Sequence, residues 1–179
     1  MNRPALLIVD MISRFDFPDG ARLARAALPV AGRIAALRAR FHRRGWPVLF
    51  ANDNFADWQT DFEGLWRLCA DPAQRGAKIA ELLAPQPQDY YVLKPKHSAF
   101  LDSALQILLA QLRVTRLVVT GVATDACLLA TAVDARMREF QVQMPPSCCA
   151  TFGAARQQRA LRLLHEAFAV SLSERLPAR

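Results

Sequence analysis

The sequence is poor in the residues that usually build metal and phosphate sites. Its 179 residues include three histidines, none of them between His42 and His97, and four cysteines without a CxxC or Cys/His ligand spacing. Structural zinc sites are usually built from such spacings. The segment MISRFDFPDG at 11–20 is also not rich in the glycine, serine or threonine of a phosphate-binding loop. We therefore expect no metal and no cofactor, and we disfavour a flavodoxin-like binding module.

Long apolar runs and paired cysteines are missing as well. The N-terminal apolar run, at 5–9, is only about five residues long, which is too short for a signal peptide or a membrane span. Cys148 and Cys149 are adjacent in the chain, and free thiols in a reducing compartment are the simplest interpretation of all four cysteines. These features predict a cytoplasmic protein with no membrane partner.

Charge is unbalanced toward the positive side, with a formal net charge of +7. Such an excess suggests nucleic-acid binding as a hypothesis. The arginines are scattered along helical segments, however, and their one cluster, RARFHRRG at 38–45, closes an amphipathic helix. Cations are favourable there because the helix dipole ends negative. We expect a solvated helix end and no nucleic-acid partner.

Short apolar runs alternate along the whole chain with longer segments of helical periodicity. The expected strands lie at 5–9, 48–51, 90–93, 116–120, 140–144 and 169–172, and the expected helices at roughly 21–44, 60–84, 102–112, 125–138 and 153–168. This alternation is typical of an α/β fold, a three-layer α/β/α arrangement with a six-stranded, mostly parallel, Rossmann-like sheet. No linker or repeat stands out, so we expect one domain over 1–179.

Polar residues follow four consecutive expected strands. Asp10 follows the first strand, Asn52 and Asp53 the second, Lys94 the third, and the segment GVATDAC at 121–127 the fourth. Open parallel sheets bind ligands at the carboxyl ends of their strands. Polar strand ends are common in ordinary loops, but four in succession predict a functional site.

Cys127 lies at the start of an expected helix, where unpaired N–H groups and the helix dipole favour a thiolate. A nucleophilic thiol also needs a proton acceptor and gains from a cation, which Asp10 and Lys94 could supply. The alternatives are an inert core thiol, a turn-capping aspartate and a solvated lysine. No histidine stands out as a base, since His97, the nearest to the site, is flanked by Lys96 and Ser98.

Four segments in order resemble the isochorismatase-like cysteine hydrolases, a family that includes nicotinamidases and carbamoylsarcosine amidohydrolases. They are LLIVDMISRF at 6–15, FANDNFADW at 50–58, VLKPKHSAF at 92–100 and VVTGVATDACLLATAVDA at 118–135. The resemblance implies a catalytic triad of Asp10, Lys94 and Cys127. Lys96 matches a second basic position of the third segment, two residues from Lys94.

The resemblance also implies how such a triad works. A cis peptide between Val122 and Ala123 would place the Ala123 N–H beside the Cys127 N–H as an oxyanion hole. The implied activity is hydrolysis of a C–N bond in a small non-peptide amide or ureido substrate through a thioester. Homodimers or homotetramers are implied as well. A catalytically silent scaffold or interaction protein is the alternative.

The sequence differs from two groups of the family in ways that narrow the range of expected reactions. Nicotinamidases carry an Asp-x-His metal motif after the second strand, whereas DNFADW follows at 53–58 in this chain. We therefore expect no metal site of that kind, which makes nicotinamide a doubtful substrate. Isochorismatases that cleave a vinyl ether lack the nucleophilic cysteine, so Cys127 argues against that reaction.

Aromatic residues near the expected catalytic edge are candidates for the walls of a substrate pocket. They are Phe15, Phe17, Trp58 and Phe100. Core or interface packing is the alternative for each of them. Asn54 could hydrogen-bond a polar group of the substrate, or could serve a turn.

Overall fold

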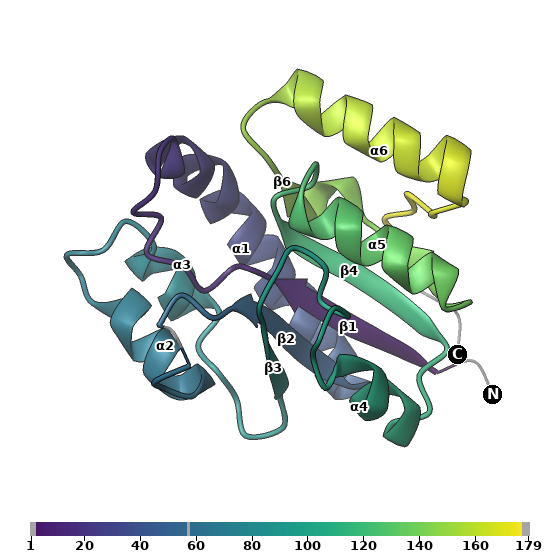
Figure 1. Cartoon of the computed structure of the whole chain (residues 1–179), viewed down its shortest axis with the longest axis horizontal. Coiled ribbons are helices and arrows are strands. Elements are labelled where there is room, and N and C mark those ends of the chain that lie inside the picture. The colour runs from purple at the N-terminus through teal and green to yellow at the C-terminus, as the bar shows by residue number, and fades with distance from the viewer. Residues whose placement is uncertain (1–2, 57, 177–179) are drawn as a thin grey trace.

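The computed structural model describes residues 3–56 and 58–176 and shows a parallel sheet between two layers of helices (Figure 1). The strands are β1 (Pro4–Val9), β2 (Val48–Asp53), β3 (Tyr90–Lys94), β4 (Arg116–Val122), β5 (Gln141–Gln143) and β6 (Cys149–Ala150). Their order is β3-β2-β1-β4-β5, and β6 pairs with the carboxyl end of β4. All of these pairings are parallel. The α/β class and the six-stranded parallel sheet expected from the sequence are confirmed.

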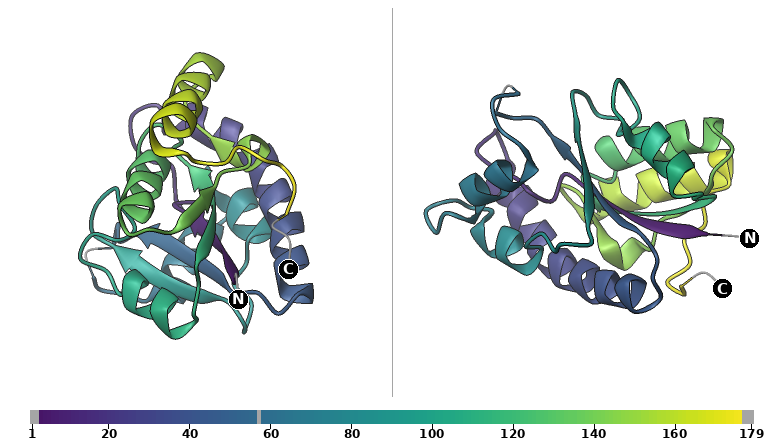
Figure 2. Two further views of the ribbon diagram at one scale, coloured as in Figure 1. Left: turned by 90° about the vertical axis from the view of Figure 1, so that its right-hand side faces the viewer. Right: turned by 90° about the horizontal axis from the view of Figure 1, so that it is seen from below.

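Alternating side chains of the central strand separate two hydrophobic cores. In β1, Leu6 and Ile8 pack on one face, whereas Ala5, Leu7 and Val9 pack on the other. The first face is covered by α1 (Gly20–Arg43), α2 (Phe62–Ala70) and α3 (Ala77–Leu82). The second is covered by α4 (Leu105–Gln111), α5 (Cys127–Met137) and α6 (Ala154–Phe168). Figure 2 shows the sheet between these layers. Burial on both faces explains why the strands are almost continuously apolar.

The helix expected at 60–84 is wrong in its extent, because two helices occupy this segment. Helix α2 ends at Ala70, and α3 begins at Ala77. Pro72 disfavours helical geometry at the residue before it, and Asp71 is accordingly extended, with φ −56° and ψ 124°. The break, DPAQRG at 71–76, contains a proline and a glycine, which are sequence signals for the end of a helix.

The last expected strand is also wrong in its position. Residues 169–172 contribute one isolated bridge, between Ser171 and Gln143, and the sixth strand is Cys149–Ala150. Ala169 ends α6 in a left-handed conformation, with φ 53°, so the chain turns before it reaches the sheet edge. The segment before β6 contains two prolines and a short 3₁₀ helix, Pro146–Cys148, and therefore has the composition of a turn.

The central strands end together at one edge of the sheet. Val9 of β1 is in register with Ala51 of β2 and with Gly121 of β4. Gly121 has φ +119°, and a Cβ atom there would stand 2.1 Å from the Val9 carbonyl oxygen. Only glycine permits this close approach of β4 to β1. The chain segments after β1 and β4 consequently begin side by side.

Candidate active site

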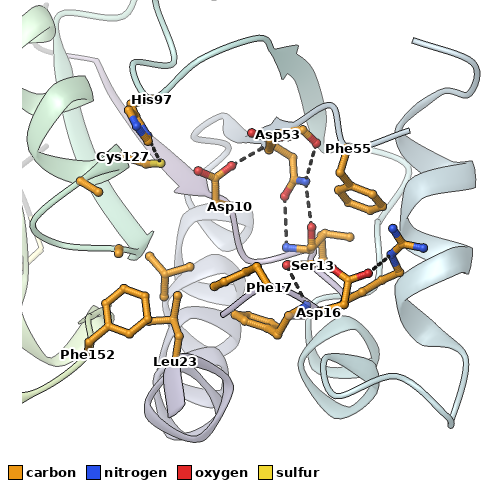
Figure 3. Close-up of a pocket in the computed structure, with 17 residues that line it drawn as sticks. Asp10, Ser13, Asp16, Phe17, Leu23, Asp53, Phe55, His97, Cys127 and Phe152 are labelled. Atoms are coloured by element: carbon orange, nitrogen blue, oxygen red, sulfur yellow. Dashed lines mark hydrogen bonds and ion pairs between the residues drawn. The ribbon is translucent and has the colours of Figure 1, made fainter. Parts of the chain in front are cut away.

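Asp10, Lys94 and Cys127 meet at this edge, although they are far apart in the chain. Asp10 directly follows β1, Lys94 is the last residue of β3, and Cys127 is the first residue of α5. Lys94 Nζ lies 2.9 Å from Asp10 Oδ2 and 3.8 Å from Cys127 Sγ. Figure 3 shows Asp10 and Cys127 facing the same cavity. The structure thus brings together the three residues that the family resemblance implies as a triad.

Lys94 is held by three acceptors. Its ammonium group contacts Asp10 and Cys127 and also donates to the backbone carbonyl of Lys96, with an Nζ···O distance of 2.8 Å. The side chain of Lys94 has no exposed surface, whereas Lys96 is exposed. The geometry therefore places the cation of Lys94 beside the thiol, and Lys96 contributes its carbonyl oxygen.

The Asp10 carboxylate is oriented by two donors. Its Oδ1 accepts the backbone N–H of Asp53 at 2.8 Å, and its Oδ2 contacts Lys94. Burial raises the pKa of Asp10, and the charge of Lys94 and a hydrogen bond from Cys127 offset this only in part. A carboxylate with a raised pKa is a stronger proton acceptor than an ordinary one. Asp10 is thus suited to take a proton from Cys127.

The surroundings of Cys127 favour its thiol form. Burial and, next, the charge of Asp10 raise the pKa of Cys127 to about 12, while Lys94 acts in the opposite direction. The helix terminus and Lys94 favour the thiolate, but burial and the Asp10 carboxylate outweigh them in this arrangement. A thiolate would form here by loss of a proton, and the Asp10 carboxylate is close enough to accept it.

Two residues whose backbone N–H groups have no acceptor among the described residues lie at the same cavity. The peptide between Val122 and Ala123 is cis, as the resemblance implies. Ala123 and Cys127 both line the cavity, and neither N–H donates to another described residue. Free N–H groups at this position are suited to an oxygen that gains negative charge during a reaction.

The cavity in front of Cys127 has a volume of about 370 Å³. Phe15 and Phe17 contribute to it, as the sequence analysis expected of them. The sequence analysis did not single out Phe55 or Phe152, which also line it. Phe55 stands two residues after β2, and this position near a strand end could have marked it as a pocket residue. Phe152 follows β6, and only the pairing of β6 with β4 brings it to the site. The apolar wall consists of Ile12, Phe15, Phe17, Leu23, Phe55, Val122 and Phe152.

Three other pocket candidates lie elsewhere. Trp58 is 63% exposed, and its backbone N–H donates to the side-chain oxygen of Asn54. Neither residue is part of the cavity wall. Phe100 is buried in the second core, with its ring 5.9 Å from that of Phe140. Asn54 therefore serves a local turn, and Phe100 serves core packing.

His97 lies at the site, although the sequence did not mark it as a catalytic base. Its Nδ1 lies 3.4 Å from Cys127 Sγ, and the ring lines the cavity (Figure 3). It comes from the loop that follows β3, three residues after Lys94. The only sequence signal for a role of His97 was its closeness to Lys94. Its contact with Cys127 depends on the path of the loop.

The donor set at this edge does not fit a nicotinamidase-type metal site. In the described ranges, 3–56 and 58–176, no three histidine, cysteine, aspartate or glutamate side chains converge as metal ligands. Asp53 is the last residue of β2, and the apolar ring of Phe55 stands two residues further on.

The chain belongs to the isochorismatase family, since the isochorismatase domain model matches residues 4–175. It is accordingly a hydrolase of that family. The uncharacterized isochorismatase family protein YaaI of Bacillus subtilis is 37% identical over 160 residues, covering 89% of this chain and 87% of that protein. Ureidoacrylate amidohydrolase RutB of Variovorax paradoxus is 30% identical over 184 residues, covering 87% of this chain and 72% of RutB.

Solved structures show the same fold. The nicotinamidase/pyrazinamidase PncA of Bacillus subtilis superposes with a TM-score of 0.76 at 26% identity, covering 96% of this chain and all of that chain. An isochorismatase family protein from Desulfovibrio vulgaris gives a TM-score of 0.77 at 24% identity, covering 96% of this chain and 93% of the other. No helix in the described part of this chain is long and apolar enough to cross a membrane.

Proposed function

We propose that this hydrolase cleaves the C–N bond of a small non-peptide amide or ureido compound through a thioester on Cys127. The observation that carries the proposal is the convergence of a proton acceptor, a cation and a thiol on one cavity. Asp10 and Lys94 are 2.9 Å apart, and both contact Cys127. The similarity to maleamate amidohydrolase of Pseudomonas putida, at 27% identity, and to RutB supports amide chemistry.

Acylation begins with proton transfer from the Cys127 thiol to Asp10. The sulfur then attacks the substrate carbonyl carbon, and the carbonyl oxygen gains negative charge beside the Ala123 and Cys127 N–H groups. Lys94 stabilises the transient thiolate and holds the protonated Asp10 in place. When the tetrahedral intermediate collapses, the C–N bond breaks and Asp10 returns its proton to the leaving nitrogen.

Deacylation reuses the same carboxylate. Asp10 takes a proton from a water molecule, which attacks the thioester carbon. The C–S bond then breaks, and the proton returns to sulfur, so that the thiol and the carboxylate are both regenerated. The net reaction consumes one water molecule and releases an acid and ammonia or an amine. No redox partner is needed.

A screen of small carboxamides and ureas for ammonia release tests this function. Wild-type protein should release ammonia and form a covalent adduct on Cys127 that intact-mass measurement detects. Cys127→Ala should retain the fold by circular dichroism but lose turnover. Cys148→Ala is the matched control, because Cys148 is a buried cysteine outside the site. More than a few per cent activity in Cys127→Ala would exclude the covalent mechanism.

A further inference from the structure

The side chains that line the cavity carry more negative than positive charge. Three carboxylates face it, those of Asp10, Asp16 and Asp53. Asp10 is paired with Lys94, and Asp16 lies 3.1 Å from the Arg14 guanidinium. Asp53 has no cationic partner among the described residues. Set against the two cations Lys94 and Arg14, the three carboxylates leave one net negative charge at the cavity, and Asp53, which is exposed to solvent, is the carboxylate without an ion pair in the described part of the chain.

The charge of Asp53 acts on the reacting group. It contributes to the raised pKa of Cys127 and to that of Lys94, in both cases through its charge. Its backbone N–H meanwhile holds Asp10 Oδ1. Asp53 is thus close enough for its field to act on a substrate bound at the thiol.

Each of the two cations near the cavity already forms an ion pair with a carboxylate of the protein. The ammonium group of Lys94 already contacts Asp10, the backbone carbonyl of Lys96 and the thiol of Cys127. Arg14 is paired with Asp16, and its guanidinium carbon lies 5.3 Å from the centre of the Phe55 ring. A substrate carboxylate that reached the Nη groups of Arg14 would meet a guanidinium whose charge is already balanced by Asp16 at Nε. It would also face Asp53, and like charges brought together at a binding site are costly.

From this charge arrangement and the apolar wall, we propose that the cavity selects neutral or cationic amides with an apolar body and discriminates against amides that carry a carboxylate. This inference rests on the proposed amide hydrolysis and narrows its substrate class. It separates this chain from relatives such as maleamate amidohydrolase and RutB, whose named substrates are carboxylates. The four phenylalanines of the wall suit a flat apolar group.

Three probes of one shape test the charge preference: benzamide, 4-(aminomethyl)benzamide and 4-carbamoylbenzoate. Ammonia release gives kcat/KM for each, and protection of Cys127 from iodoacetamide measures binding without turnover. We expect the neutral and cationic probes to exceed the anionic one by about fivefold to tenfold in both assays, as one partly screened unit charge at several ångströms implies.

Asp53→Asn should raise the anionic-to-neutral ratio by about fivefold, the size of one removed charge. Asp102→Asn is the matched control, because it makes the same change of net charge at an exposed position outside the cavity. It should leave the ratio unchanged. An equal effect of the two variants would show that net charge, and not the cavity, sets the preference, which overturns the inference.

The two assays separate this inference from the proposed function. Protection in the expected order without ammonia release would support the charge selection and contradict the amidase function. Ammonia release with preference for 4-carbamoylbenzoate would support the function and overturn the charge selection, and Arg14 would then be the carboxylate receptor. Failure of all three probes to protect Cys127 would overturn the inference as well.

Discussion

Replacing Lys94 by methionine should unfold the protein at a markedly lower temperature and abolish activity. Methionine keeps the length and apolar stem of the side chain but removes the charge that faces Asp10 at 2.9 Å. Lys94 is fully buried, and only 14% of the Asp10 side chain is exposed. The substitution therefore leaves a buried carboxylate without its cation. Asp10 would then be neutral at a higher pH and would no longer serve as a base.

The size of the effect follows from this burial. Removing one partner of a buried ion pair costs about 3–5 kcal/mol, because the remaining charge keeps its desolvation penalty. For a domain of this size, each kcal/mol lowers the midpoint of thermal unfolding by about 2–4 °C. We expect Lys94→Met to unfold about 6–20 °C below wild type at neutral pH.

The pH dependence provides a second check with a defined sign. The folded-state pKa of Asp10 is raised above its ordinary value of 3.8, so the folded state holds this proton more tightly than the unfolded state. Stability associated with Asp10 is therefore present below pH 3.8 and is lost as the pH rises through the folded-state pKa. Without Lys94 that loss should grow, so the deficit of Lys94→Met should be smaller at pH 4 than at pH 8.

Thermal unfolding followed by circular dichroism at both pH values measures this. Lys96→Met is the control, because only the backbone carbonyl of Lys96 contacts the site. It should unfold within about 2 °C of wild type. The double variant Asp10→Asn/Lys94→Met should recover part of the loss, since neither charge remains. A wild-type unfolding midpoint for Lys94→Met, or an equal loss for Lys96→Met, would refute this reasoning.

Three further predictions concern the thiol, metals and a helix cap. Asp10→Asn should lower the pH midpoint of Cys127 alkylation relative to wild type and abolish turnover, because the charge of Asp10 is, after burial, the next cause of the raised pKa of Cys127. An unchanged or higher midpoint would contradict this. Exhaustive EDTA treatment should leave hydrolysis intact, and loss of activity restored by zinc or iron would show the opposite. Asp61→Ala should cost about 1 kcal/mol in urea unfolding, because the Asp61 side chain caps α2 by accepting the Gly64 N–H; an unchanged midpoint would argue against the cap.

The local sequence pattern predicted the central strands correctly, but it predicted the sixth strand at the wrong position. The runs at 5–9 and 116–120 are buried on both faces, so their apolar character is continuous and unambiguous. The two residues of β6 are too few to leave a pattern, and they count as a strand only because β4 extends beyond β5 and leaves an edge to pair with. Residues 169–172 are apolar because Val170 is a core residue, not because they form a strand.

The sequence by itself determined which residue types stand at the strand ends, and family motifs identified Asp10, Lys94 and Cys127 among them. Only the tertiary structure decided which neighbours these residues have, and pKa values and cavity walls depend on neighbours. A helix terminus alone favours a thiolate, yet burial and Asp10 raise the pKa of Cys127 to about 12. Phe152 and His97 enter the site because strand pairing and a loop bring them there. Burial and charge at a site are sums over residues far apart in the chain, so no local segment contains them.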